Sequence, residues 1–259
     1  MIDIHTHILP YIDDGAQNFE EALHMANNFA KKGVKKIIAT PHNLKGENFP
    51  KSKKILDLIN KLNKKIKKQQ FDLEILPGAE IYLTPTLDET IKEYNFLSLN
   101  NTEYLLIELP MYFLPPYFDR IIYNLQVMGY TPIIAHPERY LPVIKNQDLL
   151  SNWIDKGVYI QLNAGSIQGV YGSKVKKTAE SILKKRLAHF IASDSHCKEQ
   201  KRGSLNDGLN KLEKILSKKE KNIFIKNSQN LIDGGKITTI TSSDNNESFL
   251  ESIKYIFNH

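Results

Sequence analysis

Seven short apolar runs, separated by longer amphipathic stretches, constrain the fold of this 259-residue chain most strongly. Each run is about five residues long, is rich in Ile, Val or Leu, and ends at a polar or small residue. Continuous apolar runs of this kind are typical of parallel strands that are buried on both faces. The runs are Met1–His5, Lys35–Thr40, Asp72–Pro77, Tyr104–Leu109, Thr131–Ala135, Val158–Leu162 and His189–Ala192.

The stretches between the runs have the period and the end signals of helices. One helix begins at the cap residue Asn18, carries Glu20 and Glu21 in its first turn, and ends near Gly33. Strands that alternate with helices form parallel sheets with right-handed crossovers, so we expect an α/β fold. If the sheet closes on itself, it forms a β/α barrel with seven strand–helix units, one fewer than the eight-stranded form has. An open doubly wound sheet also fits the period, although no glycine-rich phosphate loop follows the first strand. The other expected helices are Ser52–Lys68, Pro116–Met128, Gln147–Lys156, Ser173–Arg186 and Leu205–Leu216.

The chain has neither an interdomain linker nor an internal repeat, but its character changes after Gly235. We therefore predict one barrel domain over residues 1–235 and a C-terminal tail over residues 236–259. Within the tail, Lys236–Glu247 is polar and rich in Ser, Thr and Asn, whereas Ser248–Phe257 has the pattern of a short amphipathic helix.

The lone cysteine, Cys197, excludes an internal disulfide framework and a cysteine-based zinc site, and it indicates a reducing compartment. No apolar run approaches the roughly 18 residues of a membrane span. The segment Met1–His5 lacks the charged and apolar regions of a signal peptide. These features predict a cytoplasmic protein without membrane insertion.

The chain carries 35 Lys and Arg against 29 Asp and Glu, which gives a formal charge of +6. A nucleic-acid-binding patch would account for this charge. However, most of the basic residues are lysines in helical stretches such as Lys51–Lys68. A solvated, lysine-rich helix surface is the simpler interpretation, so we expect no nucleic-acid partner.

Histidines and acidic residues fall at or just beyond the ends of the predicted strands. In a parallel barrel the carboxyl ends of the strands form one rim, where active sites lie. Six of the seven strands deliver a His, Asp or Glu to this rim, and only the sixth, which ends at Gln161-Leu162 before Asn163, does not. The residues are His5, His7, Asp14, His42, Glu80, Glu108, His136, Asp194 and His196.

Taken singly, each position has a simpler explanation. His5 and His7 point the same way on a strand and can bind one ion, although two histidines at this spacing also occur by chance. Asp14 fits an acidic turn. Glu108 is harder to dismiss, because it interrupts an apolar run where a buried charge needs a partner. Six coincidences on one rim would be needed to explain the whole set, so the sequence predicts a metal site.

Nine ligands exceed what one ion binds, because zinc or manganese takes about four to six. Two or three ions that share a bridging carboxylate fit better, and ligands without thiolate suit Mn, Fe or Zn. Four carboxylates against three divalent ions leave about +2 on the cluster, which favours an anionic substrate such as a phosphate. Clustered ions also generate a hydroxide nucleophile and stabilise the leaving oxygen.

Two arginines follow the same pattern: Arg139 comes after His136, and Arg202 comes shortly after His196. A guanidinium at the rim can hold phosphate in a bidentate fork, and a structural ion pair with a rim carboxylate is the alternative. Cys197 and Arg202 also have the spacing of a cysteine phosphatase. The Lys-Glu-Gln-Lys between them lacks the small residues whose amides would cradle phosphate, so we expect metal-dependent chemistry.

At these residues the chain resembles the PHP (polymerase and histidinol phosphatase) superfamily, and within it the bacterial CpsB/CapC-type manganese-dependent protein tyrosine phosphatases. The resemblance rests on an ordered set of motifs that spans almost the whole chain. It implies a distorted seven-stranded β/α barrel of the PHP type, similar to a TIM barrel, with a trinuclear metal centre. The motifs are Asp3–Pro10, Ile12–Ala16, Ala39–His42, Gly78–Glu80, Ile107–Pro110, Ala135–Arg139 and Ala192–His196.

The resemblance also assigns roles to the rim residues. It implies three divalent metal ions, Mn²⁺ first and Fe or Zn as alternatives, and two arginines that contact phosphate. The first ion would be held by His5, His7, Glu80 and Asp194, the second by a bridging Glu80 with Glu108 and His136, and the third by Asp14, His42 and His196. The arginines are Arg139 and Arg202.

The reaction of the resembled family is the removal of phosphate from tyrosines, typically in the C-terminal tail of a bacterial tyrosine kinase that controls capsule or exopolysaccharide export. The expected function is therefore hydrolysis of phosphotyrosine in proteins through attack by a metal-bound hydroxide. Three alternatives stay open. They are a small-molecule phosphomonoesterase similar to histidinol phosphatase, a PHP-type nuclease supported only by the basic pI, and an inactive binding module. The complete ligand set argues against the inactive module.

Overall fold

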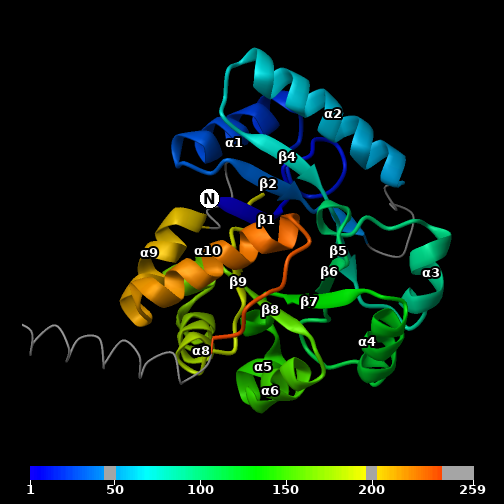
Figure 1. Ribbon diagram of the computed structural model, residues 1–259, viewed down its shortest axis with the longest axis vertical. Coiled ribbons are helices and arrows are strands. Elements are labelled where there is room, and N and C mark those ends of the chain that lie inside the picture. Colours follow the sequence, from blue (N-terminus) through cyan, green and yellow to red (C-terminus); the bar gives the residue numbers. More distant parts are fainter. Residues whose placement is uncertain (44–50, 197–202, 241–259) are drawn as a thin grey trace, which may run out of the picture.

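Parallel strands lie at the centre of the molecule, and helices surround them in the computed structural model (Figure 1). The structure describes residues 1–43, 51–196 and 203–240. The strands are β1 (Ile2–Thr6), β2 (Lys36–Ala39), β3 (His42–Asn43), β4 (Glu74–Pro77), β5 (Glu80–Tyr82), β6 (Tyr104–Glu108), β7 (Thr131–Ala135), β8 (Tyr159–Asn163) and β9 (Phe190–Ala192). The helices are α1 (Phe19–Lys31), α2 (Ser52–Lys68), α3 (Leu87–Glu93), α4 (Phe118–Val127), α5 (Leu141–Lys145), α6 (Asp148–Asp155), α7 (Ala164–Gln168), α8 (Ser173–Lys184), α9 (Leu205–Ile215) and α10 (Lys218–Ile232), with 3-10 turns at Leu99–Asn101 and Pro137–Arg139.

The strand pairs confirm an α/β fold with parallel sheets. One sheet has the order β1-β2-β4 and the other has the order β3-β5-β6-β7-β8-β9, and every pair is parallel. Each of the seven predicted runs contains a strand whose ends differ from the prediction by at most two residues. Among the described residues, the strands form these two sheets rather than one continuous closed ladder.

The sheets are divided because two strands break near their carboxyl ends. The chain leaves β2 at Ala39, passes Pro41, and resumes as β3 in the other sheet, while β4 resumes as β5 after Gly78. Proline donates no backbone hydrogen bond to a ladder. At Gly78 a Cβ atom would lie 2.6 Å from Ile38 Cγ2, so only glycine permits this approach. The new register pairs His42 with Glu80.

An edge of one sheet meets an edge of the other where the end of β1 lies against the segment after β9. Thr6 forms a parallel bridge with Ser195, and the backbone N–H of His7 donates to the Ser195 carbonyl at 2.8 Å. The Asp194 N–H donates in turn to the His5 carbonyl at 3.0 Å. These bonds bring the segment after β9 against the end of β1, so residues far apart in the sequence share one end of the sheets.

Alternate strand residues pack into two apolar layers, as the two faces of a strand require. Ile38, Leu106 and Ile133 belong to one layer, which also includes Leu231 of α10, whereas Ile37 and Ile134 belong to the other layer, which contains the buried residues of most of the helices. Both layers are almost fully buried. Because both faces of each strand are buried, the strand sequences are continuously apolar and do not alternate between apolar and polar residues.

The predicted helices with described residues are confirmed, with ends that differ by at most two residues, but α3, α5, α7 and α10 were not predicted. The prediction missed α10 because its sequence contains few apolar residues. Its start had a readable signal, since Ser217 and Glu220 form a capping box. The helix buries Phe224 and Leu231 and packs against β1 and β9.

Residues 236–240 of the predicted tail pack against α10. Ile237 and Ile240 are buried, and Asn227 exchanges two hydrogen bonds of 2.9 Å with the backbone of Thr238. The helix predicted at Ser248–Phe257 lies outside the described residues. Within the described part of the chain, no helix combines the length and apolarity that crossing a membrane requires.

Candidate metal centre

All nine predicted metal ligands lie together at the carboxyl ends of the strands. Strand β1 and its extension carry His5 and His7, and Asp14 lies in the following loop. The strand breaks bring in two more, because β3 begins at His42 and β5 begins at Glu80. The other four are at the end of β6 or just beyond β7 and β9, namely Glu108, His136, Asp194 and His196.

Glu80 lies at the middle of the cluster, and its side chain is 1% exposed. Its Oε2 atom is 3.3 Å from His5 Nε2, 3.4 Å from His7 Nε2 and 3.0 Å from His42 Nδ1. Its Oε1 atom is 2.9 Å from His136 Nε2. One carboxylate thus faces four imidazole rings that come from the ends of three strands, β1, β3 and β7, an arrangement that suits a ligand shared between ions.

The potential ligand atoms form three groups, and within each group they lie no more than 4.8 Å apart. The groups are His5, His7 and Glu80; His42, Glu80 and Glu108; and His7, Asp14, His42 and His196. They follow the three expected sets except at one position. His42 accompanies Glu80 and Glu108, where His136 was expected, and His136 instead contacts the opposite oxygen of Glu80. Asp194 Oδ1, expected in the first set, lies 3.6 Å from the Nε2 atoms of both His5 and His7.

Several cluster atoms are buried without a hydrogen bond, which tests whether cations fit here. His42 Nδ1 and Glu80 Oε2 lie 3.0 Å apart without the geometry of a hydrogen bond, and His136 Nδ1 also has no hydrogen bond, whereas buried polar atoms in proteins nearly always have one. The Nε2 atoms of His5 and His7 face each other at 3.1 Å. Imidazole and carboxylate atoms that crowd together in this way form a donor set that Mn, Fe or Zn ions would satisfy.

The pKa values within the cluster reflect the same crowding. Burial alone would lower the pKa of His7, but the Asp13 carboxylate overrides it and raises the pKa to about 9. Burial likewise opposes the charge on His42, and its contact with Glu80 raises the pKa to about 9. Burial, reinforced by Glu80, raises the pKa of Glu108 to about 7. Cations binding here would displace these protons, because metal ligands must be deprotonated.

Two of the predicted ligands follow sharp turns of the backbone. His136 and Asp194 have φ angles of 35° and 51°, in the left-handed region that residues with side chains seldom adopt. Each lies just beyond the end of its strand, and its side chain reaches the cluster, where His136 Nε2 contacts Glu80 and Asp194 Oδ1 lies near His5. Strain of this kind is found preferentially at functional sites.

Asp13 positions two of the predicted ligands, although only its neighbour Asp14 was among the residues predicted for the site. His7 Nδ1 donates to Asp13 Oδ2 at 2.8 Å, which leaves His7 Nε2 directed at the cluster. The same oxygen accepts the backbone N–H of His42 at 3.1 Å, and Oδ1 accepts the N–H of Gly15 at 2.9 Å. Metal-binding histidines commonly donate their second ring nitrogen to a carboxylate in this way.

The sixth predicted strand also contributes, through amides rather than through charged groups. His5 Nδ1 donates to Gln161 Oε1 at 3.0 Å. Gln161 Nε2 donates to Asn163 Oδ1 at 2.9 Å, and Asn163 Nδ2 donates to Asp194 Oδ2 at 2.7 Å. Both amide side chains are fully buried. This relay holds His5 and Asp194 in fixed orientations, and a search for His, Asp and Glu alone could not find it.

Replacing Asp13 with asparagine is expected to weaken Mn²⁺ binding by about 10-fold to 100-fold, because an amide has only one acceptor oxygen and its NH₂ must face either His7 Nδ1–H or the N–H of Gly15. Titration calorimetry of metal-free protein with Mn²⁺ measures this change. Asp119→Asn is the matched control, because its carboxylate is exposed and pairs with Lys156 on the outer surface. Equal Mn²⁺ affinities for Asp13→Asn and the wild type would refute the positioning role.

Of the two predicted arginines, Arg139 lies at the cluster. Its Nη1 donates to Asp194 Oδ2 at 3.1 Å, and its guanidinium lies 4.8 Å from the centre of the Tyr171 ring. The ion pair that was the alternative explanation is therefore present, and it places the guanidinium beside the predicted ligands. Arg202 and Cys197 lie outside the described residues.

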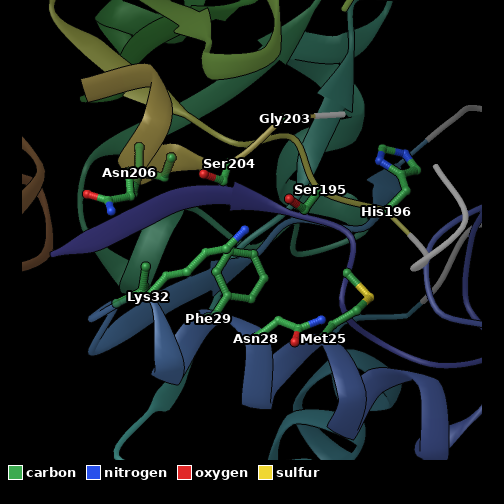
Figure 2. Close-up of a pocket in the computed structure, with 11 residues that line it drawn as sticks. Met25, Asn28, Phe29, Lys32, Ser195, His196, Gly203, Ser204 and Asn206 are labelled. Carbon is green, nitrogen blue, oxygen red and sulfur yellow. The ribbon is translucent and has the colours of Figure 1, made fainter. Parts of the chain in front are cut away.

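His196 also borders a pocket between α1 and the start of α9 (Figure 2). Phe29 of α1, Lys32 just after α1 and Ser204 just before α9 line this pocket. The His196 ring points away from Phe29 and Lys32. Its Nε2 lies 3.0 Å from Asp14 Oδ1, so the ring faces the cluster.

The family model of the CpsB/CapC capsular polysaccharide synthesis proteins matches residues 1–233. The chain belongs to the CpsB/CapC family. Tyrosine-protein phosphatase YwqE of Bacillus subtilis is 37% identical over 214 residues, which cover 83% of this chain and 84% of YwqE. Tyrosine-protein phosphatase CpsB of Streptococcus pneumoniae is 32% identical over 238 residues, 90% of this chain and 98% of CpsB. These matches confirm the resemblance to CpsB/CapC-type phosphatases that the sequence motifs indicated.

A solved structure supports the same assignment. A crystal structure from a study of YwqE of B. subtilis and CpsB of S. pneumoniae, described there as metal-dependent tyrosine phosphatases, matches with a TM-score of 0.89 and 34% identity. The match covers 93% of this chain and 97% of the other. Histidinol phosphate phosphatase of Lactococcus lactis shares the fold at a TM-score of 0.54 and 15% identity, over 84% of this chain and 94% of that one.

Proposed function

We propose that the chain is a metal-dependent phosphatase that hydrolyses phosphotyrosine in proteins. The observation that carries the proposal is the convergence of nine imidazole and carboxylate side chains at one end of the strands, with buried Glu80 among them and the Arg139 guanidinium beside them. The names of its CpsB/CapC relatives supply the substrate class. The phosphotyrosine would lie in the C-terminal tail of a bacterial tyrosine kinase, and its removal would regulate capsule or exopolysaccharide production. The phosphatase would act in the cytoplasm.

The proposed centre holds three divalent ions, most suitably Mn²⁺. His5, His7, Glu80 and Asp194 would bind one ion, Glu80 and Glu108 with His42 or His136 a second, and Asp14, His196 and His42 a third. When bound, such ions activate water for attack on phosphorus, polarise the phosphoryl oxygens and stabilise the leaving oxygen. Arg139, and by resemblance Arg202, would contact the phosphoryl oxygens that face away from the ions.

This chain's own residues prepare the site in three ways. Asp13 and Gln161 fix the ring orientation of His7 and His5 through their Nδ1 atoms. The Asn163 amide and the Arg139 guanidinium both donate to Asp194 Oδ2, so this carboxylate is oriented before any substrate arrives. Arg139 also keeps donors to spare, because a guanidinium has five N–H groups in a planar fork that matches phosphate oxygens.

The proposal extends to the architecture. We propose that the two sheets are parts of one distorted seven-stranded β/α barrel, with the broken pairs β2–β3 and β4–β5 each counting as one strand. The bridge between Thr6 and Ser195 supports this arrangement, because it joins the edges of the two sheets. The barrel domain would comprise residues 1–235, and the remainder would be the tail.

The test of the function is metal removal and restoration. Treatment with a chelator is expected to abolish turnover of a tyrosine-phosphorylated peptide and of p-nitrophenyl phosphate, and Mn²⁺ is expected to restore both. Elemental analysis of the purified protein, with Mn, Fe, Zn and Mg added back separately, identifies the working ion. Unchanged turnover by metal-free protein would refute the metal mechanism.

A parallel assay with histidinol phosphate separates the proposed function from its nearest alternative. A protein phosphatase should turn over the phosphopeptide with a much larger kcat/KM than histidinol phosphate. The opposite preference would identify a small-molecule phosphatase. Tight DNA binding that falls steeply with added salt would point instead to a nuclease.

A further inference from the structure

Three large aromatic side chains are exposed in loops that follow the strands of the metal centre. Tyr112 is 81% exposed, Tyr11 is 61% exposed and Phe113 is 57% exposed. Tyr11 lies just beyond His7, and Tyr112 and Phe113 lie just beyond Glu108. Adjacent apolar side chains that are exposed to solvent, as Tyr112 and Phe113 are, often mark interaction sites. These loops lie at the same end of the sheets as the cluster. A substrate that enters the cluster would therefore pass close to the three rings.

The loop that carries Tyr112 and Phe113 is held rigidly. The buried backbone N–H of Leu109 donates to Tyr140 Oη at 2.9 Å, and Leu141 N–H donates to the Met111 carbonyl at 2.8 Å. Prolines at positions 110, 115 and 116 fix three φ angles in the same short segment. Because the loop is already ordered, the exposed rings can bind a partner at little entropic cost.

Tyr11 stands in a different loop, which follows β1. Its φ angle is 62°, in the left-handed region, and its N–H donates to the Ala16 carbonyl at 3.3 Å. Ala16 N–H donates to the His7 carbonyl at 3.1 Å, which ties the loop to the metal centre. The Tyr11 ring meets the Phe19 ring edge-on at 6.2 Å. If β2 with β3 and β4 with β5 each count as one broken strand, β6 is three positions from β1 in the strand order. The aromatic rings therefore lie on two separate parts of the rim.

We infer that Tyr112 and Phe113, with Tyr11 on the other part of the rim, form the surface that binds the polypeptide on both sides of the phosphotyrosine. The inference rests on the proposed function and specifies how the site would recognise protein. The central ligands His5 and Glu80 are almost fully buried, whereas the three rings project into solvent. A substrate that extends beyond its phosphate can contact them, and aromatic rings bind apolar and aromatic side chains through stacked and edge-on contacts.

The test compares two substrates of one enzyme. The double variant Tyr112→Ala/Phe113→Ala, loaded with Mn²⁺, is assayed on a tyrosine-phosphorylated peptide with apolar residues on both sides and on p-nitrophenyl phosphate. The ratio of the two kcat/KM values, peptide over p-nitrophenyl phosphate, is expected to fall about tenfold or more, mainly through the KM of the peptide. Tyr123→Ala is the matched control, because Tyr123 is 65% exposed but lies on α4, and it should leave the ratio unchanged.

The other outcomes are distinguishable. An unchanged ratio, or an equal loss on both substrates, would overturn the inference while leaving the phosphatase function intact. A change in oligomeric state on size-exclusion chromatography without a change in the ratio would mean that the rings join copies of this chain, and the inference would be wrong. A wild-type protein that hydrolyses neither substrate would instead refute the proposed function itself.

Discussion

Glu80→Gln is expected to lower turnover of a phosphotyrosine peptide by about three orders of magnitude or more, because a Lewis-acid centre contributes several kcal/mol to transition-state stabilisation. Glutamine has nearly the same shape, but it removes the charge that faces four histidine rings. Its NH₂ group also replaces one of the two carboxylate oxygens. Steady-state kinetics with excess Mn²⁺ measure the loss, and elemental analysis should show fewer ions per chain.

Glu74→Gln provides the matched control for this variant. Glu74 is the first residue of β4, and Glu80 is the first residue of β5, which continues β4 after the break at Gly78. Its side chain is 57% exposed and is 3.7 Å from Lys36 at the opposite end of the sheet. The control should retain both metal content and turnover. Full metal content and near-normal turnover in Glu80→Gln would mean that Glu80 is no shared ligand.

The sequence predicted the parallel sheets and the gathering of the nine candidate side chains at one edge because both depend on local patterns. An apolar run indicates a buried strand wherever it pairs, and parallel strands bring their carboxyl ends to one edge. It therefore sufficed to find where His5, Glu108 and Asp194 fall relative to their runs. The division into two sheets was not predictable in the same way, since it depends on how closely Gly78 approaches Ile38.

The residues that orient the predicted ligands were missed for a different reason. Gln161 and Asn163 are uncharged, and their residue types alone do not suggest metal chemistry. Their contribution arises only when β8 lies between β7 and β9, where the amides connect His5 to Asp194. Asp13 and Asp14 are adjacent and chemically identical, so only the fold shows that Asp13 turns to His7 while Asp14 faces His196.

Arg139→Lys is expected to lower kcat/KM for a phosphotyrosine peptide by about 100-fold, because lysine keeps the charge but loses the fork that donates two parallel hydrogen bonds to phosphate. The Arg139 guanidinium already bonds Asp194 and lies over Tyr171, which holds its plane in place. Lysine offers no planar group for this contact. Arg120→Lys is the matched control, because Arg120 is half-exposed and pairs with Asp88.

Two measurements distinguish a phosphate contact from mere support of Asp194. If Arg139 binds the phosphoryl group, inorganic phosphate should inhibit Arg139→Lys far more weakly than it inhibits the wild type, while the Mn²⁺ content stays the same. If the arginine only holds Asp194 in place, the Mn²⁺ affinity should fall and phosphate inhibition of the loaded enzyme should stay the same. The second result would contradict the assigned role. It would leave phosphate recognition to the ions and to Arg202, so that the guanidinium beside Asp194 would serve the metal centre alone.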